Sequence, residues 1–161
     1  MSTANTLRVI ALFFAALATG GLMVNWIGLA RAMVRMSSAS AYTEFHQATN
    51  RTFDPYMPVV VIGAVLGGVI LAALSPGAWS LPGQLAVLGA LCYAATLPLT
   101  LSTNVRINKQ IAGWSIQNPP GDWRAVRARW VRFHIIRTLI SVPALVFCLY
   151  SFLAEASAQV N

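Results

Sequence analysis

The sequence contains two histidines, His46 and His134, and both lie in stretches that also carry arginine and asparagine. A neutral imidazole accepts a proton around neutral pH, so these two side chains are the first candidates for a general base. With about 100° between successive residues of a helix, His134 shares one face with aromatic, basic and hydroxyl side chains. That face consists of Trp123, Arg127, Trp130, His134, Arg137, Thr138 and Ser141.

Arg137 is the most informative residue of this face, because it lies inside an apolar run. A guanidinium group within a membrane span costs several kcal/mol unless it is paired or reaches the headgroups. Two interpretations are therefore open. Either Arg137 extends to the membrane surface, or it faces the interior of the helix bundle beside His134 and binds an anion or a ligand oxygen.

Asparagines occur on two other apolar segments. Asn104 and Asn108 are one helical turn apart. They share a face with Tyr93 and Thr100, while Asn25 lies between small residues of the first apolar run. An amide without a partner in apolar surroundings costs roughly 1–3 kcal/mol. These amides are therefore predicted either to form hydrogen bonds between helices or to line a pocket.

The segment 40–51 has the pattern of an amphipathic helix. Tyr42, His46 and Asn50 follow one another at one-turn intervals, which places them on one face. Asp54 and the proline after it end the segment. A lone histidine is more often structural than catalytic, and that interpretation stays open for His46.

Together these residues predict one site at the cytoplasmic end of a four-helix bundle. The catalytic candidates are His134, His46, Arg137 and Asn104. The substrate-binding candidates are Asn25, Asn50, Asn108, Arg127, Trp130 and Tyr42. No cofactor and no metal site is predicted, because no spacing of histidine, cysteine or carboxylate residues argues for one. Haem or a metal held by His46 and His134 stays open as an alternative.

The elements that would position these side chains are four apolar runs, each near the ~20 residues that cross the hydrocarbon layer as a helix. They cover about 7–30, 57–74, 84–101 and 135–154. The chain is 57% hydrophobic and only 9% charged, so lipid must cover much of its surface.

We therefore predict an all-α, integral membrane four-helix bundle that forms one domain over residues 1–161. An amphipathic helical segment lies between the first two spans, and a cytoplasmic helical extension precedes the fourth. Ala16-Leu17-Ala18 is similar to a signal-peptidase site, but the apolar run continues to Ala30, so we expect a retained membrane helix.

The net charge of +7 comes from 11 Lys and Arg against 4 Asp and Glu, and the basic residues flank the apolar runs. Such residues meet anionic lipid headgroups and set topology, so nucleic acid is not an expected partner. Most of the arginines lie in the connections 31–56 and 102–134. The positive-inside rule puts both connections in the cytoplasm and both termini outside. We expect a multi-pass protein of a bacterial-type inner membrane or another cell membrane.

A pattern of asparagine, tryptophan, arginine and histidine residues covers about residues 100–140. It consists of Thr103-Asn104-Val105-Arg106-Ile107-Asn108, Trp114, Pro120-Gly121-Asp122-Trp123, Arg127, Arg129-Trp130, His134 and Arg137-Thr138, and Asn25 agrees with it. This pattern resembles the anthrone-oxygenase-like family of small four-helix membrane proteins, many of which are described only as a domain of unknown function. The resemblance implies oxygenation of anthrones to anthraquinones by O2 without a dedicated cofactor.

The leading hypothesis is a membrane-embedded oxygenase that oxidises a lipophilic phenolic or polycyclic substrate by proton abstraction and enolate stabilisation. His134 or His46 would be the base. Arg137, Arg127 and Asn104 would stabilise the enolate, with Trp130 as a stacking wall. The alternatives are a non-enzymatic accessory or scaffolding subunit of a membrane complex, and a haem- or metal-binding redox protein. The expected partners are the lipid bilayer and a lipophilic small molecule, and homo-oligomerisation stays open.

Overall fold

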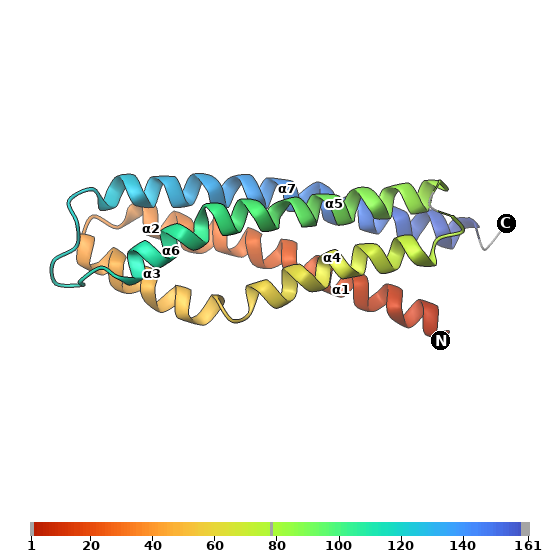
Figure 1. The fold of residues 1–161 in the computed structure, drawn as a ribbon, viewed down its shortest axis with the longest axis horizontal. Helices are drawn as coiled ribbons and strands as arrows, with labels where there is room; N and C mark the ends of the chain where they lie inside the picture. Colours follow the sequence, from red (N-terminus) through yellow and green to blue (C-terminus); the bar gives the residue numbers. More distant parts are fainter. Residues whose placement is uncertain (1, 78, 159–161) are drawn as a thin grey trace.

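The computed structural model describes residues 2–77 and 79–158, and every regular element in them is a helix. The elements are α1 (Thr3–Val24), the π-helix η1 (Asn25–Ala30), α2 (Arg31–Arg35), α3 (Ala39–Phe53), α4 (Met57–Leu74), α5 (Leu81–Ser102), α6 (Asn104–Ala112) and α7 (Trp123–Ala158) (Figure 1). The prediction of an all-α fold is confirmed.

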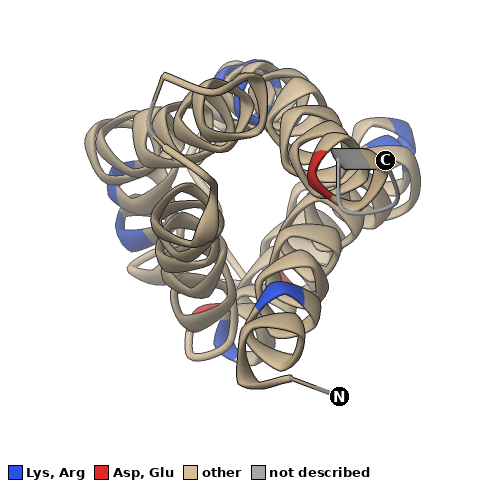
Figure 2. Ribbon diagram, turned by 90° about the vertical axis from the view of Figure 1, so that its right-hand side faces the viewer, with Lys and Arg blue, Asp and Glu red and all other residues tan. Residues whose placement is uncertain are grey.

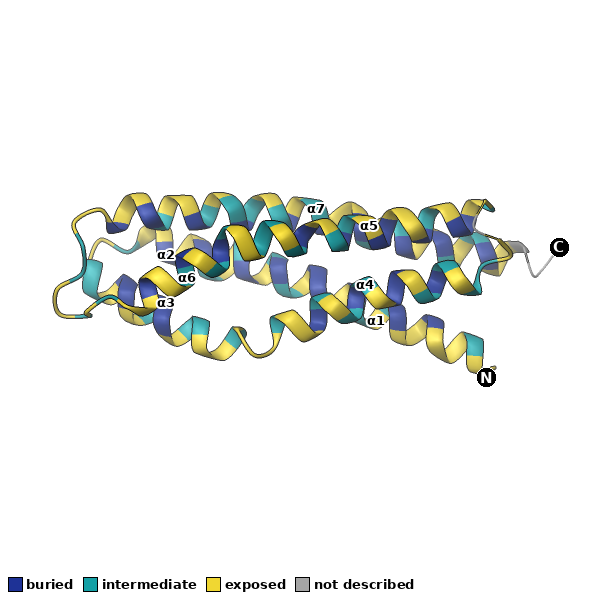
Figure 3. Cartoon of the chain, viewed as in Figure 1, coloured by how far each residue is buried: buried dark blue, intermediate teal, exposed yellow. Residues whose placement is uncertain are grey.

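Four helical stretches in the described residues are long and apolar enough to cross a membrane: Thr3–Arg35, Met57–Leu74, Leu81–Ala112 and Trp123–Ser157. Their outer faces carry large apolar side chains such as Phe13, Leu66 and Leu139, each more than half exposed. Exposed positions run along the outside of all four stretches (Figure 3). Apolar outer faces suit a hydrocarbon environment, so the fold is compatible with a multi-pass membrane protein.

The four long helices pack in a closed order. α1 packs against α4 and α7, and α5 packs against the same two helices on the other side. Viewed from the end that carries both termini, the helices surround a common axis (Figure 2). Glycines allow the closest approaches: a Cβ on Gly67 would lie 2.9 Å from the Cα of Ala11, and one on Gly68 would lie 2.9 Å from the Cα of Ala90. Small residues at helix contacts are typical of membrane helix packing.

The end of the molecule away from the termini contains additional helices. α2, α3, α6 and the first turns of α7 lie there (left in Figure 1). A second apolar cluster holds them together, including Met33, Ile111 and Trp123. Gln47 of α3 donates to the carbonyls of Ile111 (2.9 Å) and Trp114 (3.0 Å), which ties α3 to the end of α6. The predicted amphipathic segment is therefore a helix anchored to the rest of the protein.

The fourth span and its extension form one uninterrupted helix, α7, as the sequence predicts. Two irregularities were not predicted. The first span changes from α to π geometry at Asn25–Ala30, and the third is interrupted at Thr103, whose φ of −122° and ψ of −81° separate α5 from α6. Both irregularities lie beside the cavity described below, which is lined by Asn25 and Asn104. π-helical turns within α-helices are frequent at functional sites.

The end of the molecule that carries both termini is stabilised by a buried ion pair. Arg8 of α1 pairs with Glu155 of α7, and the Arg8 guanidinium also donates to the carbonyl of Leu74 at the end of α4. The side chains of Arg8 and Glu155 are only 8% and 7% exposed. This pair links three of the four spans near the termini.

Candidate active site

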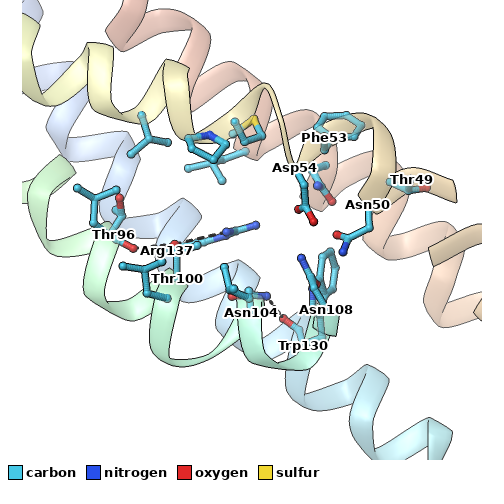
Figure 4. A pocket seen from close by; sticks show the side chains of 18 of the residues that line it. Thr49, Asn50, Phe53, Asp54, Thr96, Thr100, Asn104, Asn108, Trp130 and Arg137 are labelled. Atoms are coloured by element: carbon cyan, nitrogen blue, oxygen red, sulfur yellow. Dashed lines mark hydrogen bonds between the residues drawn. The ribbon is translucent and has the colours of Figure 1, made fainter. Parts of the chain in front are cut away.

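A cavity of about 320 Å³ lies between the spanning helices and the α3–α6 end. This volume is within the range of small-molecule sites. Its apolar lining comes mainly from α4 and α5, and its polar lining from η1, α3, α6, α7 and two threonines of α5 (Figure 4). The polar residues that line it are Asn25, His46, Thr49, Asn50, Asp54, Thr96, Thr100, Asn104, Asn108 and Arg137.

The cavity reaches the surface between α4 and α5. Ile62 and Leu101 line it and are 48% and 63% exposed, and Asp54 at the same mouth is also exposed. The mouth is therefore apolar on the side of the spanning helices and acidic on the side of the α3–α4 turn.

The structure brings seven of the ten residues singled out in the sequence to this cavity. These are His46, Asn25, Asn50, Asn104, Asn108, Trp130 and Arg137. The other three, His134, Arg127 and Tyr42, do not line it. His134 and Tyr42 are fully buried in the protein behind the cavity wall.

Arg137 reaches the cavity from α7 and is held there by His134. The Nε and Nη2 groups of Arg137 donate to Nδ1 of His134 at 3.1 and 2.8 Å. The other ring nitrogen, Nε2, is 3.1 Å from the carbonyl of Leu22, which can only accept, so Nε2 carries the proton. Both nitrogens of His134 are thus engaged. His134 acts on Arg137 as a neutral acceptor that orients the guanidinium toward the cavity.

Trp130 lies between α6 and the two histidines. Its indole is stacked parallel to the His134 ring with centroids 5.2 Å apart, and it meets the His46 ring edge-on at 5.1 Å. The indole Nε1 donates to Oδ1 of Asn108 (2.7 Å). The Asn104 side chain donates to the backbone carbonyl of Trp130 (3.1 Å). These two asparagines thus form the interhelical hydrogen bonds that the sequence left open, at the edge of the cavity.

His46 is the only histidine that lines the cavity, yet it is only 2% exposed. Its Nε2 is 3.4 Å from Oδ1 of Asn108, and its Nδ1 is 3.4 Å from the hydroxyl of Tyr42. Burial lowers the pKa of His46 to about 4, although the hydrogen bond to Asn108 opposes this shift. The imidazole is therefore neutral at physiological pH.

Arg127 and Arg137 lie on one face of α7 but contact different parts of the protein. The Nη1 of Arg127 donates to the carbonyls of Met33 (2.7 Å) and Met36 (2.8 Å), at the end of α2. The guanidinium carbon also lies 4.7 Å from the centroid of the Trp123 ring. Arg127 therefore donates to backbone carbonyls at a helix C-terminus and joins the first span to the fourth.

Among the titratable residues that line the cavity, Asp54 is the one that the sequence interpretation did not assign to the site. Its position before Pro55 marks it as a helix terminator, and it is the C-cap of α3. It nevertheless continues the one-turn spacing of His46 and Asn50, and this spacing could have identified it. Partial burial raises the pKa of the Asp54 carboxyl group, while a hydrogen bond from Asn108 and the charge of Arg137 oppose that shift.

Asn25 contributes an unsatisfied acceptor. The residue is 7% exposed, and within the described part of the chain its Oδ1 accepts no hydrogen bond. Buried amide oxygens are nearly always paired, so an unpaired one on a cavity wall is suited to a ligand that donates a hydrogen bond.

A metal or haem held by His46 and His134 would need a free ring nitrogen on each side chain. The described residues contain no group of three or more His, Cys, Asp or Glu side chains that could hold a metal ion. In addition, neither nitrogen of His134 is free to bind a metal while the bonds to Leu22 and Arg137 persist.

Comparison with known proteins gives one family. No curated protein and no solved structure matches the chain. The sequence model of the anthrone oxygenase family matches residues 45–147, which extend from α3 to α7 and include His46, Asp54, Asn108 and Arg137. The chain therefore belongs to the anthrone oxygenase family.

Proposed function

We propose that this protein is a membrane-embedded oxygenase that oxidises a lipophilic phenolic or polycyclic substrate of the anthrone type with O2. Family membership supports the reaction class. The observation that carries the proposal is the Arg137 guanidinium, which faces a largely apolar cavity and is oriented by a neutral histidine. A preorganised cation in a water-poor site stabilises an anion that develops during a reaction.

The proposed reaction begins with a carbon acid. A CH2 group conjugated with a carbonyl loses a proton, and the charge moves to the carbonyl oxygen, where Arg137 binds it. O2 then adds to the carbon, and a proton completes a hydroperoxide. Loss of water from this group, with the second hydrogen of the carbon, leaves a new carbonyl. One oxygen atom enters the product and the other leaves as water, so the substrate is oxidised by four electrons and O2 is reduced.

The remaining cavity residues have roles in binding. The Trp130 indole and the apolar side chains of α4 and α5 suit a flat polycyclic ring system. Asn50 and Asn25 offer polar atoms to its oxygen substituents. The apolar lining also keeps water from the enolate, which strengthens its interaction with Arg137.

Access from the bilayer belongs to the same proposal. The mouth between α4 and α5 exposes Ile62 and Leu101 beside the cavity, so a substrate dissolved in lipid meets an apolar opening. The lipid bilayer is thus the proposed partner, and the orientation with both termini extracytoplasmic remains part of this hypothesis.

The test uses the purified protein in lipid nanodiscs with a hydroxylated anthrone. Quinone absorbance and O2 uptake are measured for the wild type, Arg137→Met and the matched control Arg132→Met, whose arginine is exposed on the same helix. We expect loss of Arg137 to lower the rate by roughly 10²–10³-fold, as for removal of an oxyanion donor, and Arg132→Met to match the wild type. If the wild type forms no quinone above the uncatalysed rate, the oxygenase proposal fails and the accessory-subunit alternative leads.

A further inference from the structure

Asp54 and Arg137 face the same cavity from opposite walls. Asp54 lies at the end of α3, where the chain turns into α4, and its carboxylate points into the cavity (Figure 4). Arg137 enters from α7. In the part of the chain that the structure describes, the only ion pair is Arg8–Glu155, so Asp54 and Arg137 do not form a contact pair. A carboxylate and a guanidinium thus border one volume with space between them.

Neither histidine offers a free lone pair to this volume. The Nδ1 of His134 accepts from Arg137, and its Nε2–H donates to Leu22. His46 lines the cavity, but its Nε2 faces an amide oxygen of Asn108 and therefore carries the proton. The basic Nδ1 of His46 then points to the hydroxyl of Tyr42, which is fully buried.

The two histidines also lack a route for the proton. A general base must release the proton it has taken before the next turnover. His46 is 2% exposed and His134 is 0% exposed, whereas Asp54 is exposed at the cavity mouth. A carboxylate at the mouth can bind a substrate proton on the inner side and pass it to water outside.

We propose that Asp54 is the general base of this site, and that it removes the proton from the carbon acid while Arg137 receives the charge on the substrate oxygen. The inference rests on the oxygenase function proposed above. In this step the C–H bond breaks, its electron pair moves into the enolate, and an O–H bond forms on the Asp54 carboxylate. No electron leaves the substrate until O2 reacts.

The electrostatics of the cavity agree with this role. Partial burial raises the pKa of Asp54, which strengthens it as a base, while Asn108 and Arg137 oppose that shift. The titratable side chains that line the cavity are His46 on α3, Arg137 on α7 and Asp54 itself. His46 is already neutral at physiological pH, so Arg137 is the cation that faces Asp54 among the residues that line the cavity.

The experiment separates proton removal from oxidation. Under anaerobic conditions in D2O, deuterium uptake at the acidic carbon of a hydroxylated anthrone is followed by NMR, with the protein in nanodiscs. Quinone formation is then measured in air, and ligand affinity by tryptophan fluorescence. The variants are Asp54→Asn, Asp54→Glu and the control Glu44→Gln, which removes an exposed carboxylate from the same helix.

We expect Asp54→Asn to keep substrate affinity within about twofold and to lose exchange and turnover by on the order of 10²–10⁴-fold. Asp54→Glu should restore part of both rates, and Glu44→Gln should equal the wild type. Wild-type exchange in Asp54→Asn would overturn the assignment, and loss of exchange in His46→Gln alone would make His46 the base. Loss of affinity without loss of exchange would make Asp54 a binding group. If the wild type neither exchanges deuterium nor forms quinone, the proposed function itself fails, and the role of Asp54 fails with it.

Discussion

Asn25→Leu should make the protein more stable and less able to bind a hydroxylated ligand. Asn25 is 7% exposed, and its Oδ1 has no hydrogen-bond donor among the described residues. An unpaired buried amide costs roughly 1–3 kcal/mol. Leucine removes that cost and can extend into the cavity that Asn25 lines, so no neighbour must move.

The expected net gain is about 1–2 kcal/mol in the free energy of unfolding, since part of the benefit is lost in fitting the larger side chain. For a protein of this size, 1 kcal/mol corresponds to about 2–4 °C in Tm. Thermal unfolding in detergent micelles, followed by tryptophan fluorescence, should therefore show a rise of roughly 2–8 °C. Affinity for a hydroxylated anthrone should fall by a few-fold to about tenfold, the value of one hydrogen bond, while affinity for the unsubstituted ring system should not fall.

Thr19→Val provides a control of opposite sign. Thr19 is buried in the same membrane span, but its hydroxyl is paired with the Tyr93 hydroxyl (2.8 Å) and the Ser141 carbonyl (3.0 Å). Its loss should therefore destabilise the protein, by about 1–3 kcal/mol. The reasoning is refuted if Asn25→Leu lowers Tm as Thr19→Val does, or if the leucine variant binds the hydroxylated ligand as tightly as the wild type.

Two further predictions concern the packing of the spans and use the same unfolding measurement. Gly67→Ala should lower the free energy of unfolding by about 1–3 kcal/mol, because its Cβ would lie 2.9 Å from the Cα of Ala11. The control Gly20→Ala meets nothing within 4 Å and should be neutral or stabilising. Equal losses of stability at the two positions would contradict the close packing of α1 against α4. Glu155→Leu should lower the free energy of unfolding by about 3–5 kcal/mol, because it leaves Arg8 buried without its carboxylate. The double variant Arg8→Met, Glu155→Leu should recover most of that loss. A double variant as unstable as the single one would show that the loss does not come from the unpaired charge of Arg8.

Sequence periodicity predicted the parts of the site that lie on one helix. His134 and Arg137 are three residues apart in a segment without a helix breaker, and in α7 their side chains are in direct contact. The same spacing rule places Asn104 and Asn108 on one face of α6, where both bond to Trp130. Contacts within one helix follow from helix geometry alone, so they can be predicted from the sequence.

Contacts that depend on where another helix ends could not be predicted in this way. Arg127 and Arg137 lie on the same face of α7, and no periodicity distinguishes them. Their tasks differ because α2 ends opposite Arg127 and presents the carbonyls of Met33 and Met36, whereas Arg137 meets His134 and the cavity. The π-helix at Asn25–Ala30 and the interruption at Thr103 likewise were not predicted from the hydrophobic pattern of the spans.

Arg8 is buried and Arg137 is half-buried within the spans, and the protein compensates their charges in different ways. The charge of Arg8 is balanced by Glu155, and the contacts of Arg8 hold α1, α4 and α7 together. Arg137 is held instead by the neutral ring of His134. The Asp54 carboxylate lines the same cavity but does not contact Arg137. A guanidinium in contact with a carboxylate would stabilise a developing oxyanion only weakly. A guanidinium oriented by a neutral acceptor has no competing negative charge in contact with it, so it can stabilise the oxyanion more strongly. Maintaining that charge in apolar surroundings is costly for stability, and a requirement for an anion in the cavity gives this cost a physical reason.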